Sequence, residues 1–440
     1  MGLAYIAAVL EQASHTVQMI DIDADNISKE DFIKILSDSK PDLVGITATT
    51  PTVTKAIEIS KDIKNNSSAY TVIGGVHPTL KYREVVSNET IDFVIKGEGE
   101  RTVVELASCI EEGGDLSKVK GLIYKKDGGI VVNAERELIV DLDSIPFPAI
   151  HLFRNQNYTY PDSFLHPTFP IVTSRGCPGK CTFCNTKNLH GRQFRYRSAK
   201  DIVDEIEFLV NNYGAREVHI WDDNFTTSKR RVYEIRDEII KRKVRVLIAI
   251  PNGLRVDYVN LEVLTALKEM GVYAIAFGVE SGSQRILDNV KKQTTLKRIR
   301  EAFELSRKVG FEIWAFFILG LPGDDESTIM DTISFAKSLN PDIAKFHILK
   351  PFPGSTVYEE FIGQNLITDT DYEHYGIHTR PVHRLDSLSE DDLMEWQKKA
   401  YRMFYFRPSK IISQITRLKS WNRIKLNVSA GLSILKKVAF

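Results

Sequence analysis

The feature that most restricts the fold is an alternation of short apolar segments with amphipathic ones, which occurs in two stretches of the chain. Between residues 1 and 114, strand-like segments alternate with segments that have the apolar period of helices. A second series of six strand-like segments, separated by predicted helices, runs from residue 169 to 350. Short apolar strands between amphipathic helices are typical of parallel sheets covered by helices, so both stretches predict α/β structure.

The first stretch predicts a doubly wound, flavodoxin-like domain over residues 1–118. Its predicted helices are 1–13, 28–39, 52–64, 81–88 and 100–114, and its predicted strands are 16–23, 42–47, 70–75 and 92–97. In such sheets, ligands bind beyond the carboxyl ends of the strands. Small and turn-forming residues stand at three of those ends, in segments 47–50, 74–77 and 97–100. This domain therefore looks like a ligand-binding domain.

The second stretch predicts a partial (β/α)6 barrel over residues 166–360. A hairpin across 127–129 and a proline-containing linker, together residues 119–165, separate it from the first domain. The six predicted strands are 169–174, 217–222, 244–250, 273–280, 312–320 and 342–350. Six successive βα units favour a barrel with its site at the carboxyl ends of the strands. Residues 361–440 are predicted to be helical and to end in a basic tail.

The composition is that of a globular protein with an uneven distribution of charge. The chain has 440 residues, 43% of them hydrophobic and 26% charged, which excludes a disordered or collagen-like chain. Of the 58 Lys and Arg residues, eleven lie in 396–440, which contain no Asp or Glu, so residues 1–395 carry a net charge of −11. No run of 18 apolar residues and no basic n-region is present, so we expect a cytoplasmic protein without a signal peptide.

Three of the four cysteines form a C-x3-C-x2-C motif on a loop after the first barrel strand. Cys177, Cys181 and Cys184 lie within eight residues, whereas Cys109 lies in an apolar helical pattern that predicts a buried side chain. Three thiolates on one loop can hold three irons of a [4Fe–4S] cluster and leave the fourth iron open. A zinc site completed by His190 is the alternative, although zinc motifs usually contain a second cysteine pair.

Residues 169–360 resemble the radical S-adenosylmethionine (radical SAM) superfamily, which has this cysteine spacing and an aromatic residue before the last cysteine, here Phe183. The resemblance implies that the open iron chelates S-adenosylmethionine. One electron then cleaves a carbon–sulfur bond to give methionine and a 5′-deoxyadenosyl radical, which abstracts a hydrogen atom from the substrate.

The same resemblance implies contacts to S-adenosylmethionine at two further strand ends. Glu280 and Ser281 match a position that contacts ribose and methionine, and Gly320 and Pro322 belong to a segment beside the adenine. Asp222, Asp223, Asn224, Asn252 and Arg255 match positions that contact the methionine moiety or the substrate. Helix caps or solvated loops are the alternative for each of them.

Residues 1–118 resemble the cobalamin-binding domain that precedes the barrel in B12-dependent radical SAM enzymes. The matching segments are 45–50, 72–79 and 94–102. The resemblance implies cobalamin contacts from Thr47, Thr50, Gly74 and Gly75. The D-x-H-x-x-G motif that donates an axial histidine is absent, so His77 is expected to make a loop hydrogen bond. Family members have a central strand before the first helix, so we expect either a gap in the sheet between segments 16–23 and 42–47 or a sheet that closes directly.

Three functions follow from the resemblance. The first is cobalamin-dependent methylation of an unactivated carbon. The second is a radical cyclisation or rearrangement, as in the anaerobic magnesium-protoporphyrin monomethyl ester cyclase. The third is not enzymatic: a non-catalytic cobalamin or redox-sensing module. The implied partners are a small-molecule substrate, with lipid-like molecules and porphyrins as candidates, and a reductant such as flavodoxin or ferredoxin; nucleic acid is not expected.

The C-terminal tail interleaves basic and large apolar residues. Ile411, Ile412, Ile415, Leu418 and Trp421 follow helical spacing. A basic amphipathic helix of this kind can lie on an anionic membrane surface, which would place the protein at the inner face of the membrane. The alternative is that the apolar stripe packs on the acidic body of the protein.

Overall fold

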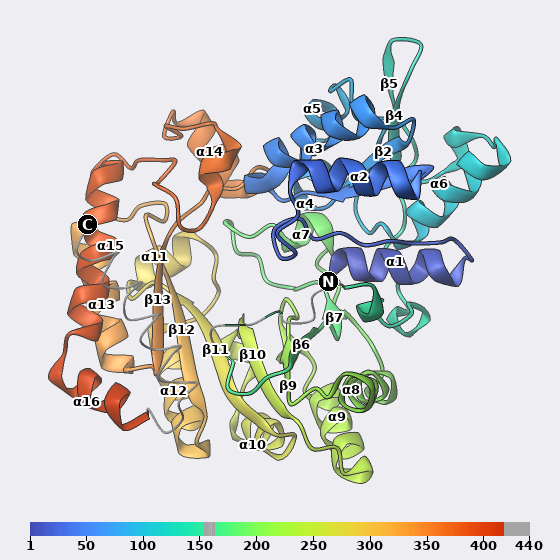
Figure 1. Ribbon diagram of the computed structural model, residues 1–440. Coiled ribbons are helices and arrows are strands. Elements are labelled where there is room, and N and C mark those ends of the chain that lie inside the picture. The colour runs from blue at the N-terminus through green and yellow to red at the C-terminus, as the bar shows by residue number, and fades with distance from the viewer. Residues whose placement is uncertain (154–157, 159, 161–162, 418–440) are drawn as a thin grey trace.

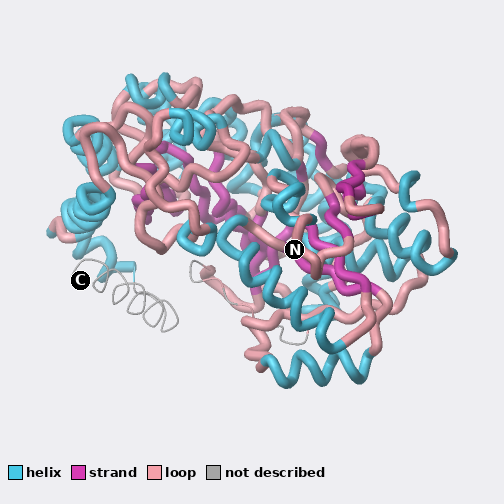
Figure 2. Tube along the Cα trace, turned by 90° about the horizontal axis from the view of Figure 1, so that it is seen from above, coloured by secondary structure: helices cyan, strands magenta, loops and turns pink. Residues whose placement is uncertain are grey.

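Two sheets organise the computed structural model, which describes residues 1–153, 158, 160 and 163–417 (Figure 1). The N-terminal sheet has the strand order β1-β2-β3-β4-β5, and the barrel sheet has the order β13-β12-β11-β10-β9-β6. The N-terminus lies between the two sheets, near the middle of the molecule in both views (Figures 1 and 2). The α/β fold class predicted from the sequence, with an N-terminal doubly wound domain and a partial barrel, is confirmed.

The N-terminal sheet combines three parallel strands with an antiparallel hairpin. Its strands are β1 (Leu43–Thr47), β2 (Tyr70–Gly74), β3 (Phe93–Ile95), β4 (Leu122–Lys126) and β5 (Gly129–Val132). Its helices are α1 (Gly2–Gln12), α2 (Lys29–Ser39), α3 (Val53–Asn66), α4 (Val76–Leu80), α5 (Tyr82–Val86) and α6 (Glu100–Glu112). The hairpin turns through Asp127 and Gly128, both with positive φ. It pairs with β3 and so extends this sheet.

The predicted strand over residues 16–23 is wrong. The chain is irregular there, and the sheet begins at β1. Ile20 and Ile22 instead pack against the small core beneath α2 and α3. Among the described residues, no strand pairs with the outer side of β1, and an extended segment without a hydrogen-bonding neighbour does not form a strand.

The barrel sheet consists of six parallel strands whose outer face is covered by helices. Its strands are β6 (Thr168–Ile171), β9 (Glu217–Ile220), β10 (Leu247–Leu254), β11 (Val272–Glu280), β12 (Glu312–Leu319) and β13 (Ile343–Ile348). Its helices are α8 (Ala199–Tyr213), α9 (Lys229–Arg242), α10 (Leu261–Glu269), α11 (Gln284–Asn289), α12 (Leu296–Val309) and α13 (Glu326–Leu339). All six strands match those predicted from the sequence.

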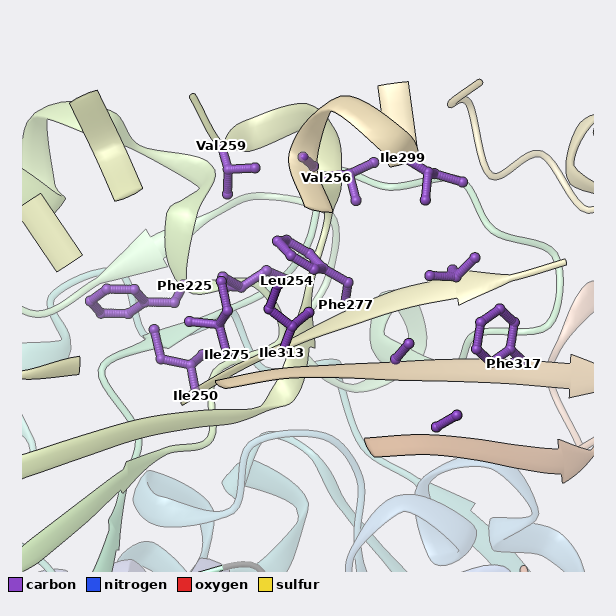
Figure 3. Packing of buried hydrophobic residues seen from close by; sticks show 14 of the residues in the cluster. Phe225, Ile250, Leu254, Val256, Val259, Ile275, Phe277, Ile299, Ile313 and Phe317 are labelled. Carbon is purple, nitrogen blue, oxygen red and sulfur yellow. The ribbon is translucent and has the colours of Figure 1, made fainter. Parts of the chain in front are cut away.

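Residues alternate between the two faces of the barrel strands. On β12, Ile313 and Phe317 join the large apolar core beneath the helices, whereas Trp314 and Phe316 lie on the other face. Figure 3 shows the first set together with Phe277 and Leu254. This large core fixes the strands, and their carboxyl ends carry the loops of the candidate site.

Short polar residues begin the barrel helices. Ser198, Thr295 and Asp325 each accept a hydrogen bond from a backbone N–H in the first turn of α8, α12 and α13. Gly214 and Gly310 end α8 and α12 in the left-handed conformation. The helix boundaries therefore follow from local sequence.

The C-terminal region contains α14 (Thr356–Gly363), α15 (Glu390–Tyr405) and α16 (Pro408–Arg417). Helix α15 covers the free edge of β13, where the backbone N–H groups of Ala344 and Phe346 donate to the hydroxyls of Tyr405 and Tyr401. The rest of the basic tail, 418–440, lies outside the described residues. Among the helices that the structure describes, none has the length and apolar content needed to cross a membrane.

Candidate cluster and cobalamin site

One loop carries all three predicted cluster cysteines. It runs between the short paired strands β7 (Ser174–Arg175) and β8 (Arg195–Tyr196), and Cys177, Cys181 and Cys184 are partly buried. The loop begins at Gly176, which has a φ of +88°. A Cβ at this position would lie 2.2 Å from the carbonyl oxygen of Gln193. Glycine is therefore required where the two ends of the loop meet.

Two aspartates after β9 anchor the start of this cluster loop. The buried Asp222 carboxylate accepts hydrogen bonds from the backbone N–H and the hydroxyl of Thr173, both at 2.6 Å. The Asp223 carboxylate accepts the backbone N–H of Gly176 at 2.9 Å and lies 3.0 Å from Nδ1 of His190. Both aspartates thus hold the protein backbone around the cysteines.

The other side of the loop is tied to the end of β13. Within the loop, α7 (Thr186–Leu189) carries Asn188, whose amide donates to the carbonyl of Gly354 at 2.8 Å. The amide of Asn185 donates to the carbonyl of Pro353 at 2.9 Å. The cluster loop therefore bridges the carboxyl ends of β9 and β13, as expected for a barrel site.

Two cations act on the thiols. Burial raises the pKa of Cys177 and Cys181, whereas Arg255 lowers both pKa values and Lys292 lowers that of Cys181. Nη1 of Arg255 lies 3.4 Å from Sγ of Cys181. Burial alone would lower the pKa of Lys292, but Glu280, whose Oε1 accepts its ammonium at 2.6 Å, raises it. Both cations favour the thiolate, which is the form that binds metal.

The spacing of the three cysteines on one loop is that of a cluster motif. Within the described ranges, no three Cys, His, Asp or Glu side chains are arranged to hold one metal ion. A [4Fe–4S] cluster places different demands on the protein, because each cysteine binds a different iron. The contact of His190 with Asp223 involves only Nδ1 and does not bear on the choice between the cluster and zinc.

Lys292 was not predicted from the sequence, where it is one of two adjacent lysines and therefore resembles a solvated surface position. Arg255 stands at a predicted site position. The other predicted positions nearby support the backbone: Oδ1 of Asn224 accepts the backbone N–H of Arg255, and the Asn252 amide donates to the carbonyl of Asp222.

The structure places Glu280 beside the cluster loop, whereas Ser281 is buried against α13. Glu280 has a φ of +67° and is 7% exposed, with its carboxylate bound to Lys292. Ser281 is fully buried, and its hydroxyl lies 3.1 Å from that of Thr332 on α13. Phe183 packs against the barrel core. Their contacts with S-adenosylmethionine stay a prediction.

The predicted adenine segment, 320–323, forms a turn that packs on the C-terminal region. Gly320 has a φ of +80°, and a Cβ there would lie 3.0 Å from Nε2 of His383. The carboxylate of Asp324 accepts two backbone N–H groups of the turn at 3.0 Å. Burial raises the pKa of Asp324 to about 6. Pro322 remains partly exposed, and the adenine contact stays a prediction.

The predicted cobalamin residues lie together at the carboxyl ends of β1 and β2. Thr47 is exposed, and Thr50 is buried. Gly75 has a φ of +107°, and a Cβ there would lie 2.6 Å from the carbonyl oxygen of Ala48. At Gly74 the nearest atom would be 3.9 Å away. The fold itself therefore requires glycine at 75, whereas position 74 has space.

His77 makes the loop hydrogen bond that the sequence predicted. Its Nδ1 lies 3.2 Å from Oγ1 of Thr50, and its buried Nε2 has no hydrogen-bond partner among the described residues. Burial lowers the pKa of His77 to about 4, so the ring is neutral at neutral pH. Tyr372 covers the ring edge-on at 4.5 Å and donates to Glu84 at 3.2 Å. No local sequence signal predicts this contact with the C-terminal region.

The two sites meet at one interface. Helix α4 follows Gly75 and packs against α7 of the cluster loop. In Figure 1 these two helices lie between the sheets. The ends of the N-terminal strands and the cysteine loop therefore face a common region.

Comparison with known proteins identifies the family. Family models match both regions: the B12 binding domain over residues 1–107 and the Radical SAM superfamily over residues 171–336. An uncharacterized methyltransferase from Pyrococcus horikoshii is 34% identical over 420 residues, which cover 94% of this chain and 89% of that protein. The chain belongs to the B12-binding radical SAM family.

Further relatives agree with this assignment. The anaerobic magnesium-protoporphyrin IX monomethyl ester cyclase of Rubrivivax gelatinosus is 30% identical, with 92% of this chain and 73% of that protein covered. The solved structure of the cobalamin-dependent S-adenosylmethionine radical enzyme OxsB, with aqua-cobalamin and S-adenosylmethionine bound, shares the fold. Its TM-score is 0.75 at 17% identity, over 99% of this chain and 69% of that one. The matches to the Radical SAM and B12 binding domain models give this enzyme a [4Fe–4S] cluster, S-adenosylmethionine and cobalamin as its cofactors.

Proposed function

We propose that this radical SAM enzyme methylates an unactivated carbon of a small molecule. The observation that carries the proposal is the contact between α4, at the end of the B12-binding strands, and α7, in the cysteine loop. A methyl transfer needs both cofactors at one interface, and this contact brings their domains together. The end-to-end similarity to the Pyrococcus methyltransferase supports the same reaction.

The residues of the barrel have distinct roles in this proposal. The cluster supplies an electron to cleave S-adenosylmethionine, and cobalamin supplies the methyl carrier. Cys177, Cys181 and Cys184 hold the cluster. Arg255 and Lys292 stabilise negative charge on the thiolates, and Glu280 fixes the ammonium of Lys292. Burial of Glu280 and Lys292 keeps their charges out of bulk water, which strengthens their interaction with the thiolates.

At the N-terminal strands, Thr47, Thr50, Gly74 and Gly75 line the proposed cobalamin site. The space at Gly74 and the exposed position of Thr47 are compatible with a bulky ligand. His77 is not expected to bind cobalt, because Tyr372 covers its ring and Thr50 engages Nδ1.

The experiment that tests this function is product analysis after anaerobic reconstitution with iron, sulfide and cobalamin. Methylation consumes two molecules of S-adenosylmethionine: one gives S-adenosylhomocysteine, and the other, after one-electron reduction, gives methionine and 5′-deoxyadenosine. Equal amounts of S-adenosylhomocysteine and 5′-deoxyadenosine support the proposal. Each turnover would need two electrons from a flavodoxin or ferredoxin: one for the reductive cleavage and one to return cobalamin to the state that accepts a methyl group.

A radical cyclase is the second candidate, because the Rubrivivax cyclase matches nearly the whole chain. That chemistry gives 5′-deoxyadenosine without S-adenosylhomocysteine. A porphyrin substrate would then replace the lipid-like candidates, and the same product analysis separates the two functions.

Contact with an anionic membrane is part of the proposal for lipid-like or porphyrin substrates. Phe406, Ile411 and Ile412 are 51%, 44% and 62% exposed at the end of α15 and on α16. Exposed apolar side chains at the start of a sequence segment that is rich in Lys and Arg favour an anionic bilayer surface. Co-sedimentation with anionic but not neutral vesicles, weakened by salt, is the expected result. Deletion of 409–440 should abolish it.

A further inference from the structure

Four charged side chains form a buried ion cluster where the N-terminal domain meets the cysteine loop. Glu98 and Glu100 follow β3, whereas Arg175 and Arg195 belong to β7 and β8, which flank the loop. Each of the four is less than a tenth exposed. Both guanidinium Nη atoms of Arg195 donate to the Glu98 carboxylate, at 2.8 and 3.0 Å. Arg175 lies 3.2 Å from Glu98 and also donates to Glu100.

The charges in this ion cluster compensate one another. Burial alone would raise the pKa of Glu98, but the hydrogen bonds from Arg195 and the charge of Arg175 hold it below its ordinary value. The linker takes part as well: the backbone N–H of Ile139 donates to Glu98 at 2.8 Å, and its carbonyl accepts from Arg195 at 2.6 Å. Three segments of the chain therefore meet at one carboxylate.

Both arginines are connected directly to the cysteine loop. Arg175 precedes Cys177 by two residues. Arg195 donates its Nη2 to the carbonyl of His190, near the other end of the loop, at 2.9 Å. The glutamates of the N-terminal domain thus hold both ends of the loop that carries the cysteines.

An ion cluster of this kind is better suited to fixing an orientation than to stabilising the fold. Buried ion pairs lose much of their Coulomb energy to desolvation, and apolar residues of similar volume are often as stabilising. A bidentate carboxylate–guanidinium pair, however, forms in only one relative orientation of its two partners. Apolar contacts between the same domains would allow them to slide.

We propose that Glu98, Glu100, Arg175 and Arg195 are positioning residues that hold the B12-binding domain and the cysteine loop in one orientation. This inference rests on the proposed methyl transfer, because only a reaction that uses both cofactors depends on their separation. Reductive cleavage of S-adenosylmethionine alone requires only the barrel.

The test compares Glu98→Gln and Arg195→Lys with the wild-type protein. Arg195→Lys keeps the charge but loses the bidentate geometry. In the cofactor-free protein, hydrogen–deuterium exchange should become faster at 97–101 and 174–196 but not in the barrel core. After reconstitution with cobalamin, we expect the ratio of S-adenosylhomocysteine to 5′-deoxyadenosine in a single turnover to fall about tenfold or more, since a 1 Å misplacement can cost ~10²-fold.

Two further variants separate positioning from stability. Glu217→Gln weakens a buried contact with His219 and Tyr273 among the barrel strands, so it should lower the melting temperature without changing the product ratio. The double variant Glu98→Met, Arg195→Met leaves no unpaired charge between these two positions, so it tests the inference even where Glu98→Gln does not fold. It should show the same lower product ratio.

An unchanged exchange pattern together with an unchanged product ratio in the Glu98 and Arg195 variants would overturn the inference. Absence of S-adenosylhomocysteine from the wild-type reaction would instead reject the proposed methyl transfer. The exchange measurement on the cofactor-free protein then still decides whether the ion cluster fixes the orientation of the domains.

Discussion

The two sheets of this enzyme differ in where their stability comes from. The barrel sheet has six parallel strands over one large apolar core, and α15 covers the free edge of β13. The N-terminal sheet has three short parallel strands and a hairpin, and its apolar contacts are divided among several small clusters.

The N-terminal region compensates through contacts with distant parts of the chain. The backbone N–H of Ala149 in the linker donates to Ala4 of α1, and Tyr372 of the C-terminal region covers His77. The cysteine loop therefore stands on the large barrel core and takes only its flanking ion pairs with Glu98 and Glu100 from the other domain, whereas the cobalamin site depends on several contacts made outside its own sheet. Five predictions test this contrast.

The largest effect is expected in the barrel. Cys181→Ala should reduce reductive cleavage of S-adenosylmethionine by about 10³-fold or more, because the cluster needs all three thiolates. The assay is anaerobic 5′-deoxyadenosine formation with a chemical reductant. Cys109→Ala is the matched control, since Cys109 lies on α6 away from the loop, and it should retain activity. Normal cleavage by the Cys181 variant would contradict the assignment of the cluster.

Truncating a buried apolar side chain should lower the free energy of unfolding by about 2–5 kcal/mol in either region, but the two regions should unfold differently. Phe303→Ala removes a buried ring that contacts Phe277 in the barrel core, and it should destabilise the whole protein. Ile73→Ala, in the N-terminal sheet, should unfold that region first. Denaturant titrations followed by hydrogen–deuterium exchange would show this order, and simultaneous unfolding of both regions in the Ile73 variant would contradict the contrast.

The same contrast explains how much the sequence could predict. The six barrel strands were predictable because each is an apolar segment between helices with clear caps, such as Ser198 and Thr295. The strand predicted at 16–23 has the same local pattern but no partner, and pairing is decided by tertiary structure. The local sequence pattern was therefore enough to predict strands where each one has a hydrogen-bonded neighbour in the sheet.

The candidate site shows a similar division. The cysteine loop was predictable from its spacing, and Arg255 from its strand end. Lys292 and the ion pairs of Glu98 with Arg175 and Arg195 join residues far apart in the sequence, so no local signal marks them. The cobalamin contact of Gly75 stays a prediction, and the structure adds a second reason for glycine there, the close carbonyl oxygen of Ala48.

The free energy of unfolding should depend on pH in opposite directions through His77 and Asp324. Each residue should change it by at most about 3 kcal/mol. Folded His77 has a pKa of about 4, so it binds fewer protons than in the unfolded chain, and stability falls as the pH drops from about 6.5 to 4. Folded Asp324 has a pKa of about 6, so it binds more protons, and stability falls as the pH rises from about 4 to 6.

His77→Gln and Asp324→Asn should each remove the corresponding slope from the free energy of unfolding. The measurement is denaturant unfolding of each variant and of the wild-type protein between pH 4 and 7. Because the wild-type minus variant difference cancels the other titrating groups, equal slopes in a variant and in the wild-type protein would contradict the assignment for that residue.

Substitutions at the two adjacent glycines should distinguish an effect on protein stability from an effect on cobalamin binding. Gly75→Ala should destabilise the N-terminal region by about 1–3 kcal/mol, because alanine is strained at this φ and contacts Ala48. Gly74→Leu should instead leave the melting temperature nearly unchanged and weaken cobalamin binding in an anaerobic titration. Undiminished cobalamin affinity in the Gly74 variant would place the corrin elsewhere.

The smallest effect is expected on the reduction potential of the cluster, which we expect Arg255 of the barrel to influence. Nη1 of Arg255 lies 3.4 Å from Sγ of Cys181, and its charge and hydrogen bond stabilise the more negative, reduced cluster. Arg255→Met removes both, so the potential should become more negative. A hydrogen bond worth about 1 kcal/mol corresponds to ~40 mV for one electron. Arg285→Met, which removes an exposed arginine paired with Asp325, is the control and should leave the potential unchanged. A redox titration followed by electron paramagnetic resonance measures both variants, and equal potentials would show that Arg255 positions the loop without tuning the cluster.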